Sequence, residues 1–295
     1  MPDIRFDDVT KEFDEAQGLF HVSFQVEEGQ AFAVLGTQGA GKSTIASLLM
    51  GLILSDEGKC EVRGFDCFLH RKDVHKLVGF TPALAAFPPE VNGEYYMRML
   101  SERHGGISEK RVQSLMEKLD INPMGPFGRM TMENRRKMAL LFGLMYDSPI
   151  LVLDEPYASL QVFARNALTD LLEEEKKSGK TILILTHVLQ QAQRLCDRMA
   201  ILRKGRVVVE QSAQQMQFSR QKVYHVTFET PEEAARFSQE WEKGVELVGA
   251  RAIIAIPGSP QMLIKTLARY DVKDLVGGRD QSEESFLHDW GNEML

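Results

Sequence analysis

Residues 36–44, which read G-T-Q-G-A-G-K-S-T, restrict the possible folds more than any other segment of this 295-residue chain. An apolar run at 31–35 precedes them, and a helix-like segment at 42–52 overlaps their end. A glycine-rich loop in this place turns its backbone N–H groups inward, and the helix N-terminus adds partial positive charge. The spacing G-x-x-x-x-G-K-[ST] predicts a loop that binds nucleotide phosphates. A chance glycine-rich turn would not explain strand, spacing and helix together.

The lysine and the serine of this motif have separate expected roles. Lys42 would contact the β- and γ-phosphates of ATP, and the Ser43 hydroxyl would bind Mg²⁺. The nucleotide-binding residues that we expect in this loop are Gly36, Gln38, Gly39, Ala40, Gly41, Lys42, Ser43 and Thr44. The motif therefore predicts ATP and Mg²⁺ as the ligands.

A second apolar run, I-L-V-L at 150–153, ends in two carboxylates, Asp154 and Glu155. Ligands bind at the carboxyl ends of the strands in parallel sheets, so these side chains would face the phosphate loop. Asp154 is expected to hold Mg²⁺, and Glu155 to orient or deprotonate the water that attacks the γ-phosphate. This pattern is common by itself, and it gains weight beside the loop at 36–44.

A third apolar run, at 182–185, is followed by Thr186 and His187. A single histidine after a strand is usually structural. Its expected position at the same sheet edge favours a contact with the γ-phosphate.

Apolar runs alternate with helix-like segments through the first 220 residues, which predicts an α/β fold, a P-loop NTPase core around a largely parallel sheet. A helical insertion at about 83–146 interrupts the pattern, and its methionines at helical spacing are interpreted as core. A small α+β domain at 221–295 is predicted to follow. Its expected strands and helices are 223–228 (strand), 231–241 (helix), 245–256 (strand), 260–270 (helix), a short strand, and 283–290 (helix).

Composition excludes several classes. The net charge of −7 gives no sign of the clustered positive charge that nucleic-acid-binding proteins usually carry, so no nucleic-acid partner is expected. Three cysteines without metal-ligand spacing indicate reduced thiols in the cytoplasm. The N-terminus does not read as a signal peptide, and no apolar stretch approaches the ~20 residues of a spanning helix. Work at a membrane would therefore require another chain.

Taken together, these motifs resemble the ATP-binding subunits of ABC transporters over nearly the whole chain. Phe13 stands where that family stacks an aromatic ring on adenine, although alone it would be read as core. The run L-C-D-R-M-A-I-L-R-K-G-R at 195–206 is similar to the stretch after the family's switch histidine. The ending S-E-E-S-F-L at 282–287 is similar to a tail of bacterial ABC-2-type exporter subunits.

The resemblance implies ATP hydrolysis with Glu155 and His187 in catalytic roles. It implies two partners, a separate transmembrane permease subunit and a second ABC ATPase subunit. The chain would then be cytoplasmic and peripheral on the inner face of the cell membrane.

Three elements depart from the family pattern. Ala83 occupies the place of the Q-loop glutamine, M-T-M-E-N at 130–134 replaces the signature segment, and Gln161 replaces the D-loop aspartate. In this family two subunits enclose ATP, with the P-loop of one facing the signature of the other. The residues of the P-loop side (the near side) are suitable here except Ala83, whose place serves coupling to the membrane partner as much as catalysis. The segment at 130–134 and Gln161 belong to the side offered to the partner's nucleotide (the far side).

The leading hypothesis is an exporter ATPase subunit that pairs with a different, intact ATPase subunit and hydrolyses ATP weakly alone. A homodimer is left open. The alternative is a nucleotide-gated regulatory or assembly protein that binds ATP without driving transport. An ABC protein acting on ribosomes or DNA and a P-loop kinase are less favoured. The sequence does not name the transported substrate, and the direction of transport is suggested only by the similarity at 282–287.

Overall fold

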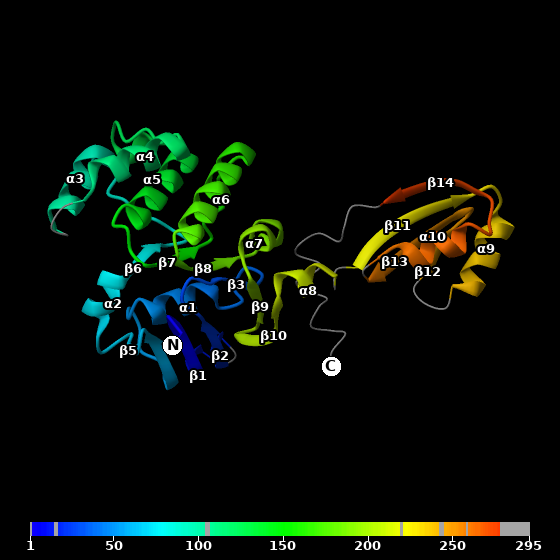
Figure 1. The fold of residues 1–295 in the computed structure, drawn as a ribbon, viewed down its shortest axis with the longest axis horizontal. Coiled ribbons are helices and arrows are strands. Elements are labelled where there is room, and N and C mark those ends of the chain that lie inside the picture. Colours follow the sequence, from blue (N-terminus) through cyan, green and yellow to red (C-terminus); the bar gives the residue numbers. More distant parts are fainter. Residues whose placement is uncertain are drawn as a thin grey trace. The chain divides into compact units, whose positions relative to one another are not determined.

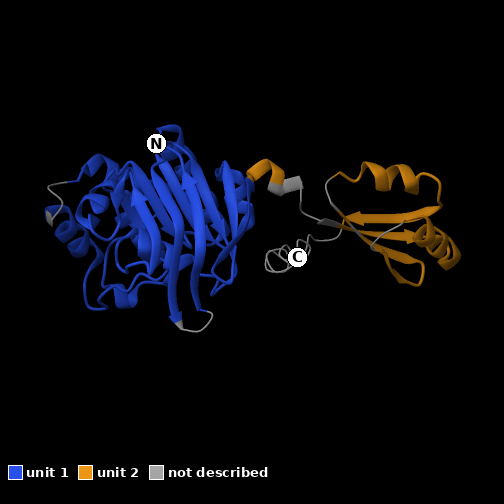
Figure 2. Ribbon diagram, turned by 90° about the horizontal axis from the view of Figure 1, so that it is seen from below, with its two compact units in different colours: residues 1–211 blue, residues 212–295 orange. Residues whose placement is uncertain are grey.

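The computed structural model divides the chain into two compact units, residues 1–211 and 212–295 (Figure 2). The residues that the structure describes are 2–14, 17–103, 107–218, 221–241, 245–257 and 259–277. The boundary predicted near Arg220 lies outside the described residues, as do the helix expected at 283–290 and the tail motif at 282–287.

A six-stranded sheet forms the centre of the first unit, in the order β10-β9-β3-β8-β7-β6 (Figure 1). The strands are β3 (Ala31–Leu35), β6 (Val78–Thr81), β7 (Ile150–Asp154), β8 (Thr181–Thr186), β9 (Arg198–Arg203) and β10 (Arg206–Ser212). The five strands from β9 to β6 pair in parallel. Every residue of β3, β7 and β8 is buried, which is why these strands are continuously apolar in the sequence.

A second, antiparallel sheet covers part of this core and was not predicted. Its order is β2-β1-β4-β5, and its strands are β1 (Ile4–Asp14), β2 (Gln17–Val26), β4 (Glu57–Val62) and β5 (Phe65–Asp66). Stacked rings join the two sheets, since Phe24 lies 4.6 Å from Phe6 and 5.5 Å from Phe32 between ring centroids.

Outside the predicted insertion, the helices that connect the strands of the first unit are α1 (Lys42–Leu49), α2 (Arg71–Leu77), α6 (Val162–Lys177) and α7 (Leu189–Leu195). Helix α8 (Ala213–Phe218) lies at the start of the second unit. Helix α1 ends before the predicted residue 52 because Gly51 has a φ of +61°. A Cβ at Gly51 would lie 2.2 Å from the Cys67 carbonyl oxygen, so the chain turns there at a glycine.

The predicted helical insertion contains α3 (Gly93–Arg103), α4 (Glu109–Leu119), the short 3₁₀ helix η1 (Phe127–Arg129) and α5 (Met132–Leu144). Helix α5 packs closely on β6, since a Cβ at Gly79 would lie 2.3 Å from the Gly143 carbonyl oxygen. This contact fixes the insertion to β6, the strand that pairs with β7.

The second unit is a four-stranded antiparallel sheet with two helices. Its elements in chain order are β11 (Gln221–Phe228), α9 (Pro231–Glu240), β12 (Val245–Val248), β13 (Arg251–Pro257), α10 (Gln261–Leu267) and β14 (Val272–Gly277). The strand order β12-β13-β11-β14 gives the βαββαβ chain a ferredoxin-like topology. The single strand predicted at 245–256 was wrong, because Gly249 with a φ of +63° turns the chain into a hairpin.

Candidate nucleotide site

The loop between β3 and α1 needs its glycines for steric reasons. A Cβ at Gly36 would lie 2.7 Å from the Leu202 carbonyl oxygen, and one at Gly41 would lie 2.7 Å from Leu19 Cδ2. Gly39 and Gly41 have φ values of +79° and +110°, which other residues rarely adopt. The loop therefore takes a conformation suited to close approach by phosphate oxygens.

Some of the other loop residues are exposed to solvent, and others support the shape of the loop. Gln38, Gly39 and Ser43 are exposed, whereas Ala40 is buried. The Thr44 backbone N–H donates to the Gly41 carbonyl at 3.1 Å as α1 begins. The exposed members thus line the open side of the loop, and the buried ones hold its shape.

Lys42 folds back over the loop in this structure. Its ammonium group donates to the carbonyls of Gly36 at 2.7 Å and Thr37 at 3.0 Å. It also pairs with Oε1 of Glu155 at 3.1 Å, and the lysine is 6% exposed. Lys42 therefore has acceptors that a phosphate group could replace, and its charge is balanced by the carboxylate predicted to act on the attacking water.

Asp154 ends β7 with a buried carboxylate that has unused binding capacity. It is 3% exposed, and its Oδ1 atom has no hydrogen-bond partner among the described residues. Burial raises the pKa of Asp154, while a hydrogen bond from the Ser43 hydroxyl opposes that rise. An orphaned carboxylate oxygen beside a hydroxyl is a donor set that fits a hard divalent cation such as Mg²⁺.

Glu155 adopts a left-handed backbone conformation, with a φ of +47°. Its N–H donates to the Leu185 carbonyl at 2.7 Å, which ties the residue after β7 to the end of β8. Oε2 lies 2.8 Å from His187 Nδ1 and accepts from the Thr186 hydroxyl at 3.3 Å. A non-glycine residue held in this region is strained, and such strain is concentrated at functional sites.

Lys42, Glu155 and His187 thus form a continuous chain of contacts across the ends of β3, β7 and β8. The sequence assigned these residues to one sheet edge, and the structure brings them together there.

Phe13 lies near the end of β1 with its side chain 53% exposed. The Lys11 ammonium lies 5.9 Å from its ring centroid. The neighbouring Glu12 pairs with Gly18, whose carbonyl oxygen would lie 3.3 Å from a Cβ on Gly41. The exposed ring is therefore carried by a hairpin that reaches the phosphate loop, where a nucleotide base could stack on it.

Residues from the three segments that were expected to depart from the family pattern lie close together. Ala83, Met132 and Ser159 line one small cavity of about 190 Å³. The Glu133 carboxylate accepts a hydrogen bond from the Gln161 backbone N–H at 3.3 Å. Glu133 is therefore bound to the start of α6 within its own chain, and this hydrogen bond joins the segment at 130–134 to the segment at 159–161.

Arg136 on α5 belongs to this region and was not identified from the sequence. It is 5% exposed, and its guanidinium donates to backbone carbonyls that follow β6 and β7. Its acceptors are the carbonyls of Pro82, Ala83, Asp154, Glu155 and Pro156. Burial lowers its pKa to about 10, which leaves it charged at neutral pH. Its spacing of four residues from Leu140 could have indicated that Arg136 lies on the buried face of the helix.

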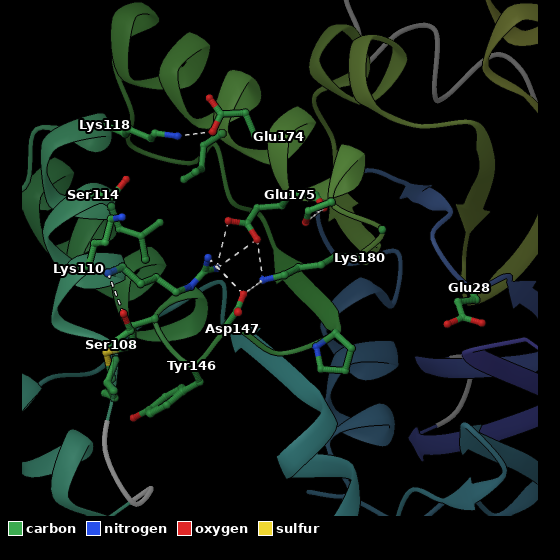
Figure 3. Close-up of a pocket in the computed structure, with 18 of the residues that line it drawn as sticks. Glu28, Ser108, Lys110, Ser114, Lys118, Tyr146, Asp147, Glu174, Glu175 and Lys180 are labelled. Atoms are coloured by element: carbon green, nitrogen blue, oxygen red, sulfur yellow. Dashed lines mark hydrogen bonds and ion pairs between the residues drawn. The ribbon is translucent and has the colours of Figure 1, made fainter.

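A cavity of about 820 Å³ lies away from this site, beside the residues that precede β7 and β8 (Figure 3). Arg111 and Lys180 are paired there with Asp147 and Glu175. These ion pairs connect α4 of the insertion to α6 and the strand starts. The cations are neutralised within the chain, and we interpret the cluster as a structural connection.

Comparison with known proteins identifies the family. The ABC transporter family model matches residues 19–158. The Nod factor export ATP-binding protein I of Rhizobium etli is 31% identical over 216 residues, covering 71% of this chain and 68% of the relative. The chain belongs to the family of ABC transporter ATP-binding proteins. A protein of the same name from Rhizobium sp. (strain N33) is 28% identical over 297 residues, 97% of this chain and 96% of the relative.

Solved structures agree on the fold of this ABC ATP-binding protein. The ATP-binding subunit of an ABC transporter superposes with a TM-score of 0.65 at 24% identity, covering 72% of this chain and 91% of that one. A bacterial Atm1-family ABC exporter with ATP bound gives 0.64 at 22% identity, covering 73% and 40%. The predicted P-loop NTPase fold is confirmed, and family members bind and hydrolyse ATP. Among the described residues, no helix has the length and apolarity to cross a membrane.

Proposed function

We propose that this chain is the ATPase subunit of a membrane exporter, working with a separate transmembrane permease and a second ABC ATPase subunit at the inner face of the cell membrane. The names of its relatives support export, since several are Nod factor export ATP-binding proteins. The observation that carries the proposal is the contact of Lys42, Glu155 and His187 beside an intact phosphate loop.

Asp154 and Ser43 would hold Mg²⁺, which neutralises phosphate charge when bound. Lys42 would exchange its carbonyl and carboxylate partners for the β- and γ-phosphates. Glu155, released from Lys42, would then hold the attacking water. His187 would keep the Glu155 carboxylate in place through their 2.8 Å contact and would itself contact the γ-phosphate.

The far side supports a pairing of unlike subunits. Met132 is 68% exposed at the start of α5, where it replaces a small residue, and Glu133 is engaged with Gln161. A P-loop in a partner would meet these residues in place of a sound signature. This chain would therefore complete its own site with the partner's signature and offer a degenerate site in return.

Co-purification tests the transport function. The tagged full-length chain, isolated in mild detergent from its native host, is expected to bring down a polytopic membrane protein and a second ABC ATPase. The Lys42→Ala variant should retain both partners if assembly does not need ATP. Recovery of the chain with neither partner would contradict the proposal.

A nucleotide-gated regulator is the second candidate, favoured by Ala83. The methyl group of alanine can neither reach a bound metal's water nor relay a hydrogen bond to a membrane partner. Binding of MgATP without a membrane partner, together with a soluble partner protein that is released on ATP addition, would support this function.

A further inference from the structure

Arg136 is a buried charge whose hydrogen bonds, within the described residues, go to backbone carbonyls and to no carboxylate. Removing a guanidinium from water is costly, and an apolar side chain of similar size usually stabilises a core as well or better. The presence of this buried charge therefore points to a role in holding the carbonyls that it binds.

Those carbonyls lie at two adjacent strand ends. β6 and β7 pair in parallel, with Thr81 opposite Leu153, and the chain leaves the sheet just after each of them. Nη1 donates to Pro82 at 2.5 Å and Ala83 at 3.2 Å, and Nη2 donates to Asp154 at 2.6 Å. One side chain thus fixes the backbone at position 83 and the backbone that carries the two carboxylates.

Helix α5 also begins within the segment at 130–134, which belongs to the far side. Its N-cap is Thr131, whose hydroxyl accepts from the Asn134 N–H at 3.1 Å, and Arg136 lies in the second turn. Arg136 therefore connects the beginning of α5 with the segment that carries Asp154 and Glu155. At position 83, where an alanine lacks polar side-chain atoms, Arg136 binds the backbone instead.

We propose that Arg136 is a positioning residue, which sets Asp154 and Glu155 for Mg²⁺ and water and links their placement to the start of α5. The expected effect of Arg136 on ATP turnover rests on the proposed ATPase function. The expected effect of Arg136 on metal-dependent nucleotide binding can be measured without turnover.

The experiment compares Arg136→Gln and Arg136→Lys with the wild-type full-length chain. Arg135→Gln is the matched control, because Arg135 is the exposed neighbour on the same helix. Binding of a fluorescent ATP analogue is measured in EDTA and across a Mg²⁺ titration. Amide hydrogen exchange is followed in peptides that cover 82–84 and 154–157, and phosphate release is measured in parallel.

We expect Arg136→Gln to leave affinity in EDTA within about twofold of wild type. The Mg²⁺ concentration for half-maximal binding should rise about 10–100-fold, the range typical for loss of a residue that supports a metal ligand. Exchange should increase in both peptides, Arg136→Lys should recover part of the effect, and Arg135→Gln should show none.

Folded Arg136→Gln protein with wild-type Mg²⁺ dependence and wild-type exchange would overturn the proposal. A lower melting temperature with unchanged Mg²⁺ dependence would assign Arg136 a purely structural role and would overturn it too. If Arg136→Gln does not fold, Arg136→Lys decides by the same readouts. Absence of phosphate release from every variant and wild type would contradict the ATPase function and leave the binding result valid.

Discussion

Lys42 and Glu155 neutralise each other, at 3.1 Å between Nζ and Oε1. Both side chains are largely buried, and each is predicted to turn toward ATP or its attacking water. Under the proposed roles this contact would have to break before hydrolysis, which would couple nucleotide binding to the activation of Glu155 through one ion pair.

Glu155→Gln tests this coupling. The amide cannot accept a proton from water, and it no longer holds Lys42 by charge. We expect phosphate release to fall at least 100-fold, in the range of a lost general base, with nucleotide binding equal or tighter. Glu174→Gln, an exposed glutamate paired with Lys118, should change neither quantity. Wild-type turnover in Glu155→Gln would remove Glu155 from its assigned role.

Asp154→Asn should stabilise the metal-free protein. Because burial raises the pKa of Asp154, its ionised form opposes folding at neutral pH, and that opposition fades as the pH falls. The neutral amide removes it, so thermal melts in EDTA should show a gain of about 1–3 kcal/mol. The further stabilisation by MgATP should be lost.

Asp147→Asn is the opposite-sign control for that measurement. A hydrogen bond from Lys180 lowers the pKa of Asp147, so this carboxylate adds stability that is present at neutral pH and lost on acidification. Its removal should lower the melting temperature slightly. A melting temperature that falls in Asp154→Asn and not in Asp147→Asn would contradict the electrostatic account of the site.

Sequence motifs predicted the near-side residues because their expected chemistry depends on fixed spacing along the chain, and the structure brings Lys42, Glu155 and His187 into contact. Arg136 could not be found in this way. Its partners are backbone carbonyls at 82–83 and 154–156, and carbonyls carry no residue identity. Likewise, the contact of Glu133 with Gln161 depends on how α5 and α6 begin beside each other.

At the scale of elements, the packing of α5 on β6 determines where the insertion meets the sheet. Two glycines allow this approach, Gly79 on the strand and Gly143 on the helix. The strands buried on both faces were predictable from their continuous apolar runs. The antiparallel sheet was not, because β1 and β4 mix buried with exposed residues and pair across about fifty residues of chain.

Gly143→Ala tests this packing. The new methyl group would lie 2.3 Å from Thr81 Oγ1 and 2.8 Å from the Phe80 carbonyl oxygen, so helix and strand must separate. We expect a loss of about 1–3 kcal/mol in the free energy of unfolding, measured by urea denaturation. Gly64→Ala meets no atom within 4 Å and should cost only the strain of its positive φ. Equal effects of the two substitutions would contradict close α5–β6 packing.

At the scale of the whole molecule, the two units have separate cores. The first is built around the stacked rings of Phe6, Phe24 and Phe32, and the second around Phe228 and Phe237 at 5.2 Å. The core clusters share no residue. All the residues assigned to the nucleotide site lie in the first unit.

Truncation after residue 212 should therefore leave a folded domain. We expect a single cooperative melt and MgATP affinity within about threefold of the full chain, because each unit buries its own apolar side chains. A truncated chain that aggregates or loses nucleotide binding would show that the second unit is needed for the first to fold.

The central claim for the whole molecule is that a sound near side is limited by a degenerate far side in the same chain. Steady-state ATP turnover of the purified chain, compared with the double variant Met132→Gly, Glu133→Gly, tests this claim most directly. We predict MgATP binding with slow turnover for the wild type, and turnover at least tenfold faster and cooperative in ATP for the variant, since two intact P-loops would then face two open signatures. Fast, cooperative turnover by the wild-type chain alone would contradict the account.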